Sequence, residues 1–173
     1  MKNTLTAEDL IRLLGLEPLE PEGGYFRQTY RAAETIPRAA LPARYVADKA
    51  FSTAIYYLLT PDTQSALHRL PTDEVYHFYL GDPVTLLQLY PGGASEMVTL
   101  GPRIDQGQRV QAVVPAGTWQ GSLLNPGGAW VLMGTTMAPG FDDSDFALGE
   151  RAALLAQYPE RAELIVRLTP PFR

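Results

Sequence analysis

Short stretches of alternating apolar and polar residues dominate the middle of the chain and predict β-strands. From residue 51 onwards these stretches are rich in β-branched and aromatic residues, and each ends at a Pro, Gly, Asn or Asp turn. The turn signals recur about every eight to twelve residues, a spacing typical of an antiparallel sandwich or barrel rather than of βαβ units. The expected strands are 53–59, 66–69, 75–80, 84–90, 96–100, 108–114, 119–124 and 129–137.

The N-terminal part of the chain has a helical pattern followed by one more strand. Thr6 is a suitable N-cap, Leu10, Leu13 and Leu14 share one face, and Gly15 fits a left-handed cap. Residues 25–30 have the aromatic and β-branched content of a strand. Residues 32–50 show neither the two-residue alternation of a strand nor the pattern of a capped helix, and they are expected to form a long loop.

After Gly140 the pattern becomes helical again. Asp142, Asp143 and Asp145 are capping residues, and the apolar positions from Phe146 onwards fit a helix that ends near Tyr158. A second short helix is expected over 160–168. The sequence therefore predicts an all-β fold with short N- and C-terminal helices that cover a sheet edge or an outer face. At 173 residues, one domain over 1–173 is expected.

Composition narrows the function classes. The chain has no cysteine, which excludes disulfides, thiolate metal sites and cysteine nucleophiles. A net charge of −5 without a basic stripe argues against nucleic acid and anionic membranes as partners. No apolar run is long enough to span a bilayer, and the N-terminus does not resemble a signal peptide, so a cytoplasmic location and a small-molecule or protein partner are expected.

The candidate chemistry is concentrated in one short segment. Both histidines of the chain, His68 and His77, flank Glu74. Because alternate residues of a strand share a face, an inward Glu74 implies inward Tyr76 and Phe78, with His77 on the other face. His68 lies on the preceding strand, across a turn, and its ring can reach Glu74. Such a pair can bind a divalent metal or act as a general acid and base.

These motifs resemble those of the cupin superfamily. His68, Glu74 and Gly81 match the first signature motif, and residues 115–120, Pro-Ala-Gly-Thr-Trp-Gln, match the second. Two departures stand out: Arg69 and Leu70 provide no second histidine, and Gln120 stands where the second motif has a histidine. With residues 20–30 and 139–146, the match resembles the small single-domain, uncharacterised branch (domain of unknown function family 985), similar in fold to germins and epimerases. The resemblance implies a jelly roll (double-stranded β-helix), usually dimeric, with a pocket in the barrel, and brings no established activity.

On this resemblance the site residues are assigned as hypotheses. His68 and Glu74 are the candidate catalytic pair, and with Gln120 they are the candidate ligands of a divalent metal such as Fe, Mn, Ni or Zn. A purely structural buried pair is the alternative for His68 and Glu74. The candidate substrate-binding residues are Gln120, Tyr76, Phe78, Trp119, Tyr25, Arg27 and His77. Arg27 could equally face solvent, and His77 could lie on the outside or at an interface.

Three functions remain open from the sequence. The leading hypothesis is an isomerase or epimerase that moves a proton on a sugar or a hydroxy or keto acid inside the barrel. The second is a metal-dependent enzyme of the oxygenase or lyase type, and the third is a ligand-binding protein without catalysis. A homodimer is expected, with a partner covering aromatic residues such as Phe51, Tyr56 and Tyr57.

Overall fold

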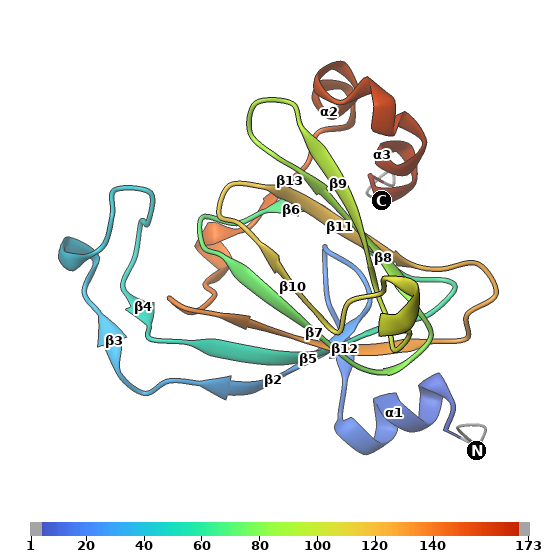
Figure 1. Ribbon diagram of the computed structural model, residues 1–173. Coiled ribbons are helices and arrows are strands. Elements are labelled where there is room, and N and C mark those ends of the chain that lie inside the picture. Colours follow the sequence, from blue (N-terminus) through green and yellow to red (C-terminus); the bar gives the residue numbers. More distant parts are fainter. Residues whose placement is uncertain (1–4, 170–173) are drawn as a thin grey trace.

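Two antiparallel β-sheets pack face to face around a common core (Figure 1). The structure is a computed structural model, and it describes residues 5–169. The first sheet contains, in spatial order, β1 (Glu17–Pro18), β2 (Tyr25–Arg31), β5 (Thr53–Leu59), β12 (Val131–Met137), β7 (Glu74–Gly81) and β10 (Gln111–Val114). The second sheet contains β13 (Ala147–Leu148), β6 (Gln64–Arg69), β11 (Trp119–Leu124), β8 (Val84–Leu89) and β9 (Ser95–Leu100). The all-β prediction is confirmed.

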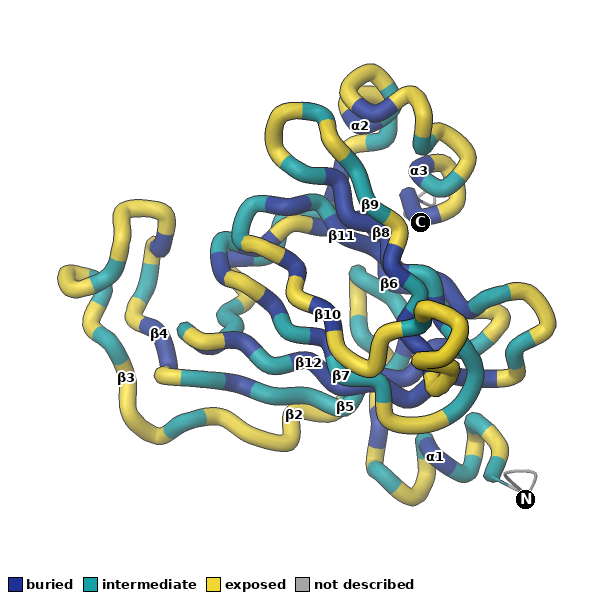
Figure 2. Tube along the Cα trace, viewed as in Figure 1, coloured by how far each residue is buried: buried dark blue, intermediate teal, exposed yellow. Residues whose placement is uncertain are grey.

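The core lies between the inner faces of the two sheets. On β7, Glu74 and Tyr76 are buried while Val75 and His77 are only half-buried, as strand alternation requires. By contrast, the central strands β8, β11 and β12 are buried at nearly every position (Figure 2). The buried apolar residues of this core are Tyr57, Leu59, Tyr76, Val84, Leu86, Val98, Leu100, Ala112, Val114, Leu124, Val131 and Met133.

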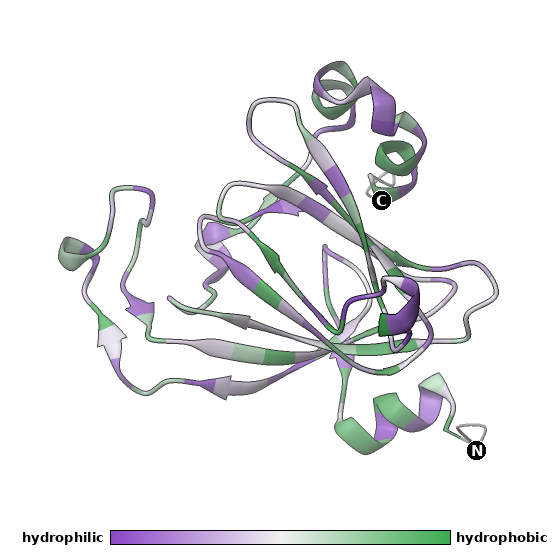
Figure 3. Ribbon diagram, viewed as in Figure 1, coloured by the Kyte–Doolittle hydropathy of each residue, from purple (hydrophilic) through white to green (hydrophobic). Residues whose placement is uncertain are grey.

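Short helices cover the outer faces of both sheets, as expected. Helix α1 (Ala7–Leu14) begins at Thr6, whose hydroxyl and Asp9 form a capping box, and it packs on Leu58 and Leu132 of the first sheet. Hydrophobic and hydrophilic segments alternate along this helix (Figure 3). Helices α2 (Arg151–Gln157) and α3 (Ala162–Leu168) cover the second sheet, where they bury residues such as Leu87. No helix within residues 5–169 has the length and apolar character needed to cross a membrane.

Two sequence-based boundaries are wrong. The helix expected from Phe146 onwards begins only at Arg151, with Glu150 as its N-cap. Residues 146–149 are extended instead, because β13 pairs with β6 and the Gly149 N–H donates to the carbonyl of Leu67 at 2.7 Å. The expected loop over 32–50 contains a small sheet of β3 (Thr35–Ile36) and β4 (Lys49–Ala50). The remaining elements are 3-10 helices at Arg38–Ala40, Ile104–Gln106, Asp143–Asp145 and Pro159–Arg161.

A buried ion pair fixes the segment that follows β12. Lys49 Nζ lies 2.6 Å from Asp145 Oδ2, and both side chains are almost fully buried. The sequence had suggested a capping role for Asp145. Asp142 takes that role, since its carboxylate accepts from the N–H of Ser144. The ion pair therefore ties the small β3–β4 sheet to the turn directly before Phe146.

Candidate functional site

A cavity of about 70 Å³ lies between the sheets, at the end where β2, β5, β6, β7 and β12 come together. Its ionisable lining residues are Glu22, His68 and Glu74. The other lining residues are Leu19, Phe26, Gln28, Thr53, Ala54, Ile55, Leu70, Thr135, Met137 and Phe141. The volume is large enough for several water molecules or for the polar end of a small ligand.

An irregularity in the pairing of β6 with β11 brings His68 to this cavity together with Ser65. Gln120 pairs with His68, but Ser122, two residues along β11, pairs with Ser65, three residues along β6. The extra residue on β6 is a β-bulge, and it places both Ser65 and His68 on the inner face. Gly121 lies opposite the bulge, where a Cβ would come within 2.9 Å of the carbonyl oxygen of Ser65.

The His68 ring is held in one orientation and one tautomer. Its Nδ1 lies 2.8 Å from the carbonyl oxygen of Ala66, and a carbonyl can only accept, so Nδ1 carries the proton. Its other nitrogen, Nε2, faces Glu22, with 3.9 Å between Nε2 and the carboxylate oxygen Oε2. The ring stacks on Phe146, with 5.1 Å between the ring centroids. In the neutral form, Nε2 is therefore a fixed base beside the cavity.

Glu74 is a buried carboxyl group at the start of β7, which follows β6 in the chain but lies in the opposite sheet, so it and His68 are not on paired strands as the sequence suggested. Gln120 Nε2 donates to Glu74 Oε2 at 2.7 Å. Burial is the main influence on its pKa and raises it above the ordinary glutamate value; the nearby Glu22 adds to this effect. His68 and the hydrogen bonds from Thr135 and Gln120 act in the opposite direction and only partly offset it. Glu74 therefore keeps its proton to a higher pH than an exposed glutamate does.

The raised pKa of Glu74 predicts a measurable effect of pH on stability. Folding favours the protonated carboxyl, so between the ordinary and the raised pKa the native state binds more protons than the unfolded state, and stability falls as pH rises. We expect Glu74→Gln to remove this loss, so that its stability gains on the wild type as pH increases through that window. Urea unfolding at a series of pH values measures the difference, with Glu17→Gln on exposed strand β1 as the control for removing one charge. A flat or falling difference would contradict the prediction.

Glu22 is a site residue that sequence reasoning missed. It lies on the loop between β1 and β2, where Ser65 Oγ donates to its carboxylate at 2.6 Å and the Ala66 N–H donates to its carbonyl at 2.8 Å. The loop can approach β6 this closely because Gly23 follows, with φ of 104°, at a point where a Cβ would overlap the backbone of Gln64. In the sequence, Pro21 and the glycines at 23 and 24 indicate a turn here, and residues 20–30 contribute to the family resemblance, but none of these signals marks Glu22 as a site residue.

Gln120, Tyr76 and Phe78 point to the interior but lie behind the cavity. Gln120 reaches the site through Glu74, whereas Tyr76 and Phe78 pack in the core between the sheets. Burial raises the pKa of Tyr76 well above the ordinary phenol value, so this hydroxyl stays protonated. These three side chains therefore support the site from within the barrel.

Four other predicted binding residues lie on outer faces, and the structure does not bring them to the cavity. Tyr25 packs under helix α1, and the Arg27 guanidinium lies 5.9 Å above the Tyr56 ring, so neither closes a pocket mouth. Trp119 packs toward helices α2 and α3. His77 faces outward, as strand alternation indicated, with Nε2 3.2 Å from the Thr136 hydroxyl.

The candidate metal ligands do not converge as a coordination site. Within residues 5–169, no three His, Asp or Glu side chains are grouped so that they could hold an ion. Gln120 directs its amide N–H to Glu74 and so donates a hydrogen bond where a metal ligand would offer oxygen. This donor set does not fit a resident metal, and no chemical step is assigned to one.

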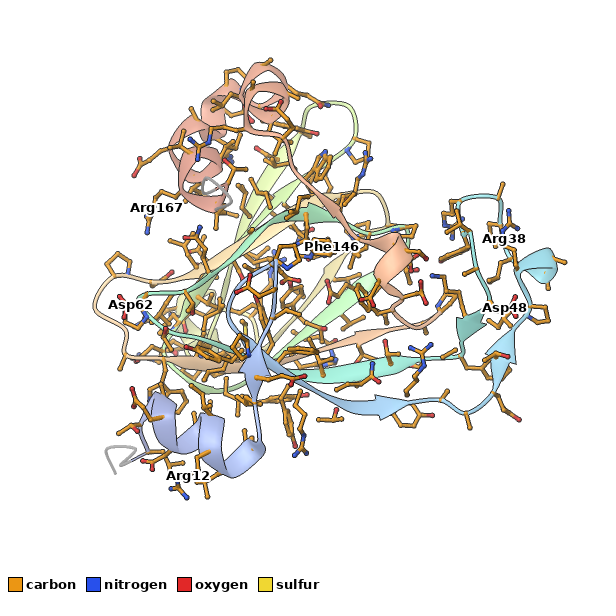
Figure 4. All side chains as sticks on the ribbon, turned by 180° about the vertical axis from the view of Figure 1, so that it is seen from behind. Arg12, Arg38, Asp48, Asp62, Phe146 and Arg167 are labelled. Carbon is orange, nitrogen blue, oxygen red and sulfur yellow. The ribbon has the colours of Figure 1, made fainter. Side chains whose placement is uncertain are left out.

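A second space of about 370 Å³ adjoins the cavity on the outside, and the two share Leu19, Glu22, Phe26 and Phe141. Its further lining residues are Glu20, Pro21, Asp143 and Phe146. Figure 4 shows Phe146 in the middle of the molecule, near the loop between β1 and β2. A larger surface depression of about 580 Å³, lined by Arg44 and Arg69 among others, includes neither His68 nor Glu74. The outer space is thus the approach to the site, with three phenylalanines around it.

Comparisons with known proteins agree with this fold. The family model described as the cupin superfamily (DUF985) matches residues 8–149. An uncharacterized protein of Saccharomyces cerevisiae is 29% identical over 151 residues, which cover 82% of this chain and 75% of the yeast protein. A hypothetical protein from Leishmania major is 30% identical with a TM-score of 0.85, covering 95% of this chain and 99% of that one. A Shewanella oneidensis protein of known structure is 32% identical with a TM-score of 0.85, covering 98% of this chain and 100% of that one.

Proposed function

Since the chain belongs to the cupin superfamily (DUF985), we propose that its cavity binds a small organic molecule and moves a proton on it, as an isomerase or epimerase does. The substrate is a sugar or a hydroxy or keto acid. The observation that carries this proposal is the placement of two groups in one cavity: the His68 imidazole, whose Nδ1 proton is held by the Ala66 carbonyl while Nε2 faces Glu22, and Glu74, a carboxyl of raised pKa.

The two groups suit opposite halves of a proton transfer. His68 Nε2 accepts a proton from the carbon next to a substrate carbonyl, and the bonding electrons move to form the enol. Protonated Glu74 donates its proton to the carbonyl oxygen, so no isolated anion forms in the buried site. Return of a proton to carbon restores the carbonyl and both residues. Glu22, facing His68, stabilises the imidazolium formed in the first step.

A pair of tryptophan variants tests whether the cavity is the binding site. Gln28 is exposed and lines the cavity, whereas Arg27, its neighbour on β2, faces the outside. For a ligand found by screening metabolites with thermal shift, Gln28→Trp is expected to weaken binding at least about tenfold by filling the mouth. Arg27→Trp should change the affinity less than about twofold. Equal affinities in both variants would place the ligand elsewhere, and tight binding without any product would favour a non-catalytic binding protein.

We also propose that the protein is a homodimer, as its family resemblance implies. Part of the outer face of the first sheet is apolar and exposed, including Tyr79 and Val113. Tyr57, one of the residues expected at the interface, is buried in the core instead. Sedimentation equilibrium at micromolar concentration is expected to give the dimer mass, and Val113→Asp to shift the protein toward monomer. A wild-type protein that sediments only as a monomer would reject the dimer.

A cytoplasmic location also stays a prediction.

A further inference from the structure

We propose that the ligand of this cavity is an uncharged or cationic molecule that donates hydrogen bonds through hydroxyl or amine groups, and that carboxylates and phosphates are excluded. This inference rests on the proposed function and narrows it: of the two substrate classes, it selects the sugar or polyol type and rejects the acids.

The charges around the site carry the first part of the argument. The cavity and the outer space are lined by four carboxyl groups, from Glu20, Glu22, Glu74 and Asp143. Within residues 5–169 no lysine or arginine lines either space. His68 is the only lining group that can become cationic, and Glu22 already faces its Nε2. An anionic ligand would therefore meet uncompensated negative charge along its whole path.

Two cations on nearby elements are held by other partners, and a third, Arg31, donates from its guanidinium to the carbonyl of Phe141 at 3.2 Å. Lys49 is paired with Asp145 inside the protein, with 2.6 Å between Nζ and Oδ2. Arg27, which could have recognised a carboxylate or phosphate, lies over Tyr56 on the outer face of the sheet. Neither can reach a ligand in the cavity without a rearrangement of the strands that hold them.

The hydrogen-bonding groups give an independent second argument. The donors beside the cavity are already used on protein acceptors: Ser65 Oγ on Glu22, Gln120 Nε2 on Glu74 and His68 Nδ1 on Ala66. The carboxylate of Glu22 is the acceptor that lines both spaces. In the part of the chain that the structure describes, the buried polar atoms without a hydrogen-bond partner are Oε1 of Gln88 and Gln120 and the hydroxyls of Thr118 and Ser122, and none of these residues lines the cavity or the outer space.

A ligand beside the Glu22 carboxylate is bound more favourably if it offers a hydrogen-bond donor than if it offers another acceptor. In the cavity itself, the Glu22 carboxylate accepts hydrogen bonds, whereas protonated Glu74 offers a single donor. Hydroxyl and ammonium groups supply donors, whereas a carboxylate or phosphate supplies more acceptors. The walls of the outer space, Phe26, Phe141 and Phe146, suit the C–H face of a sugar or a flat ring.

A matched set of three probes tests the inference: benzyl alcohol, benzylamine and benzoate, which share a ring and differ in the polar head. Their dissociation constants are measured at pH 7 and low salt by NMR titration, with the shifts of the His68 ring and the Gly23 and Gly24 amides as reporters of the cavity. Benzyl alcohol and benzylamine are expected to bind at least about tenfold tighter than benzoate. Added salt should narrow the gap between benzylamine and benzoate.

Two charge variants separate electrostatics from shape. Glu22→Gln is expected to reduce the preference of benzylamine over benzoate to less than about threefold, and Glu20→Gln, at an exposed position of the outer space, to reduce it by a smaller factor. Benzoate binding at the cavity as tightly as the other probes would overturn the inference and leave the proposed binding site intact. No shift at the cavity reporters with any probe at millimolar concentration would overturn both.

Discussion

Replacing His68 with alanine is expected to lower kcat/KM for the substrate of the cavity by about 100- to 10,000-fold, the usual contribution of a positioned general base. The reason is geometric: within residues 5–169, this imidazole is the only one that lines the cavity, and its tautomer is fixed by the Ala66 carbonyl. The measurement is steady-state kinetics on a substrate found by the metabolite screen, with circular dichroism to establish that the variant is folded.

His77→Ala is the matched control, because it removes the other histidine of the chain from the outer face of the same region. It should leave kcat/KM within about threefold of the wild type, since its ring does not line the cavity. A His68→Ala protein that keeps full ligand affinity and turnover would reject the proton-transfer mechanism. Loss of affinity in His68→Ala, for a ligand that even the wild type never converts, would leave a binding protein.

Asp145→Ala is expected to lower the free energy of unfolding by about 3–5 kcal/mol, because it leaves the ammonium group of Lys49 buried without a counter-ion. The double variant Lys49→Met with Asp145→Ala removes both charges and should recover much of this loss. Urea unfolding followed by circular dichroism measures the three proteins. A single variant within about 1 kcal/mol of the wild type would show that the pair contributes little.

The Asp145 variant should also affect the site, since the ion pair anchors the turn directly before Phe146, whose ring stacks on His68. In Asp145→Ala the imidazole is expected to lose this support, and the NMR resonances of the His68 ring should shift or broaden. Unchanged His68 resonances in a folded Asp145→Ala protein would separate the stability role of the pair from any role at the site.

The strands were predictable from the sequence, and so was the inward direction of Glu74 and Tyr76, because both follow from local patterns. Turn residues fix where strands end, and alternation fixes that Glu74 and Tyr76 share one face while His77 has the other. Strand alternation also limits how many residues of a family motif can be assigned to the site. Trp119 and Gln120 are neighbours on β11, so only one of them can face the interior, and it is Gln120.

What the sequence could not provide depends on contacts between distant segments. Glu22 reaches the site through Ser65, 43 residues away, and nothing around Glu22 marks that contact. For Tyr25 and Arg27, the strand was predictable, but which of its faces points to the interior was not, because aromatic side chains occur on both faces. The docking of α1 on Tyr25 determines which face is the outer one. Phe146 fits a helical face, yet pairing of the neighbouring β13 with β6 outweighs that local preference.

The bulge at β6 makes the identity of the interior residues depend on chain length as well as on residue type. The three-residue spacing from Ser65 to His68 lets both side chains face inward only because of the bulge; in a strand with uninterrupted alternation, the imidazole and the serine hydroxyl would lie on opposite faces. A relative that is one residue shorter between these two positions can therefore present the same serine and histidine to the interior from a regular strand, so an alignment should allow a one-residue gap within residues 64–69.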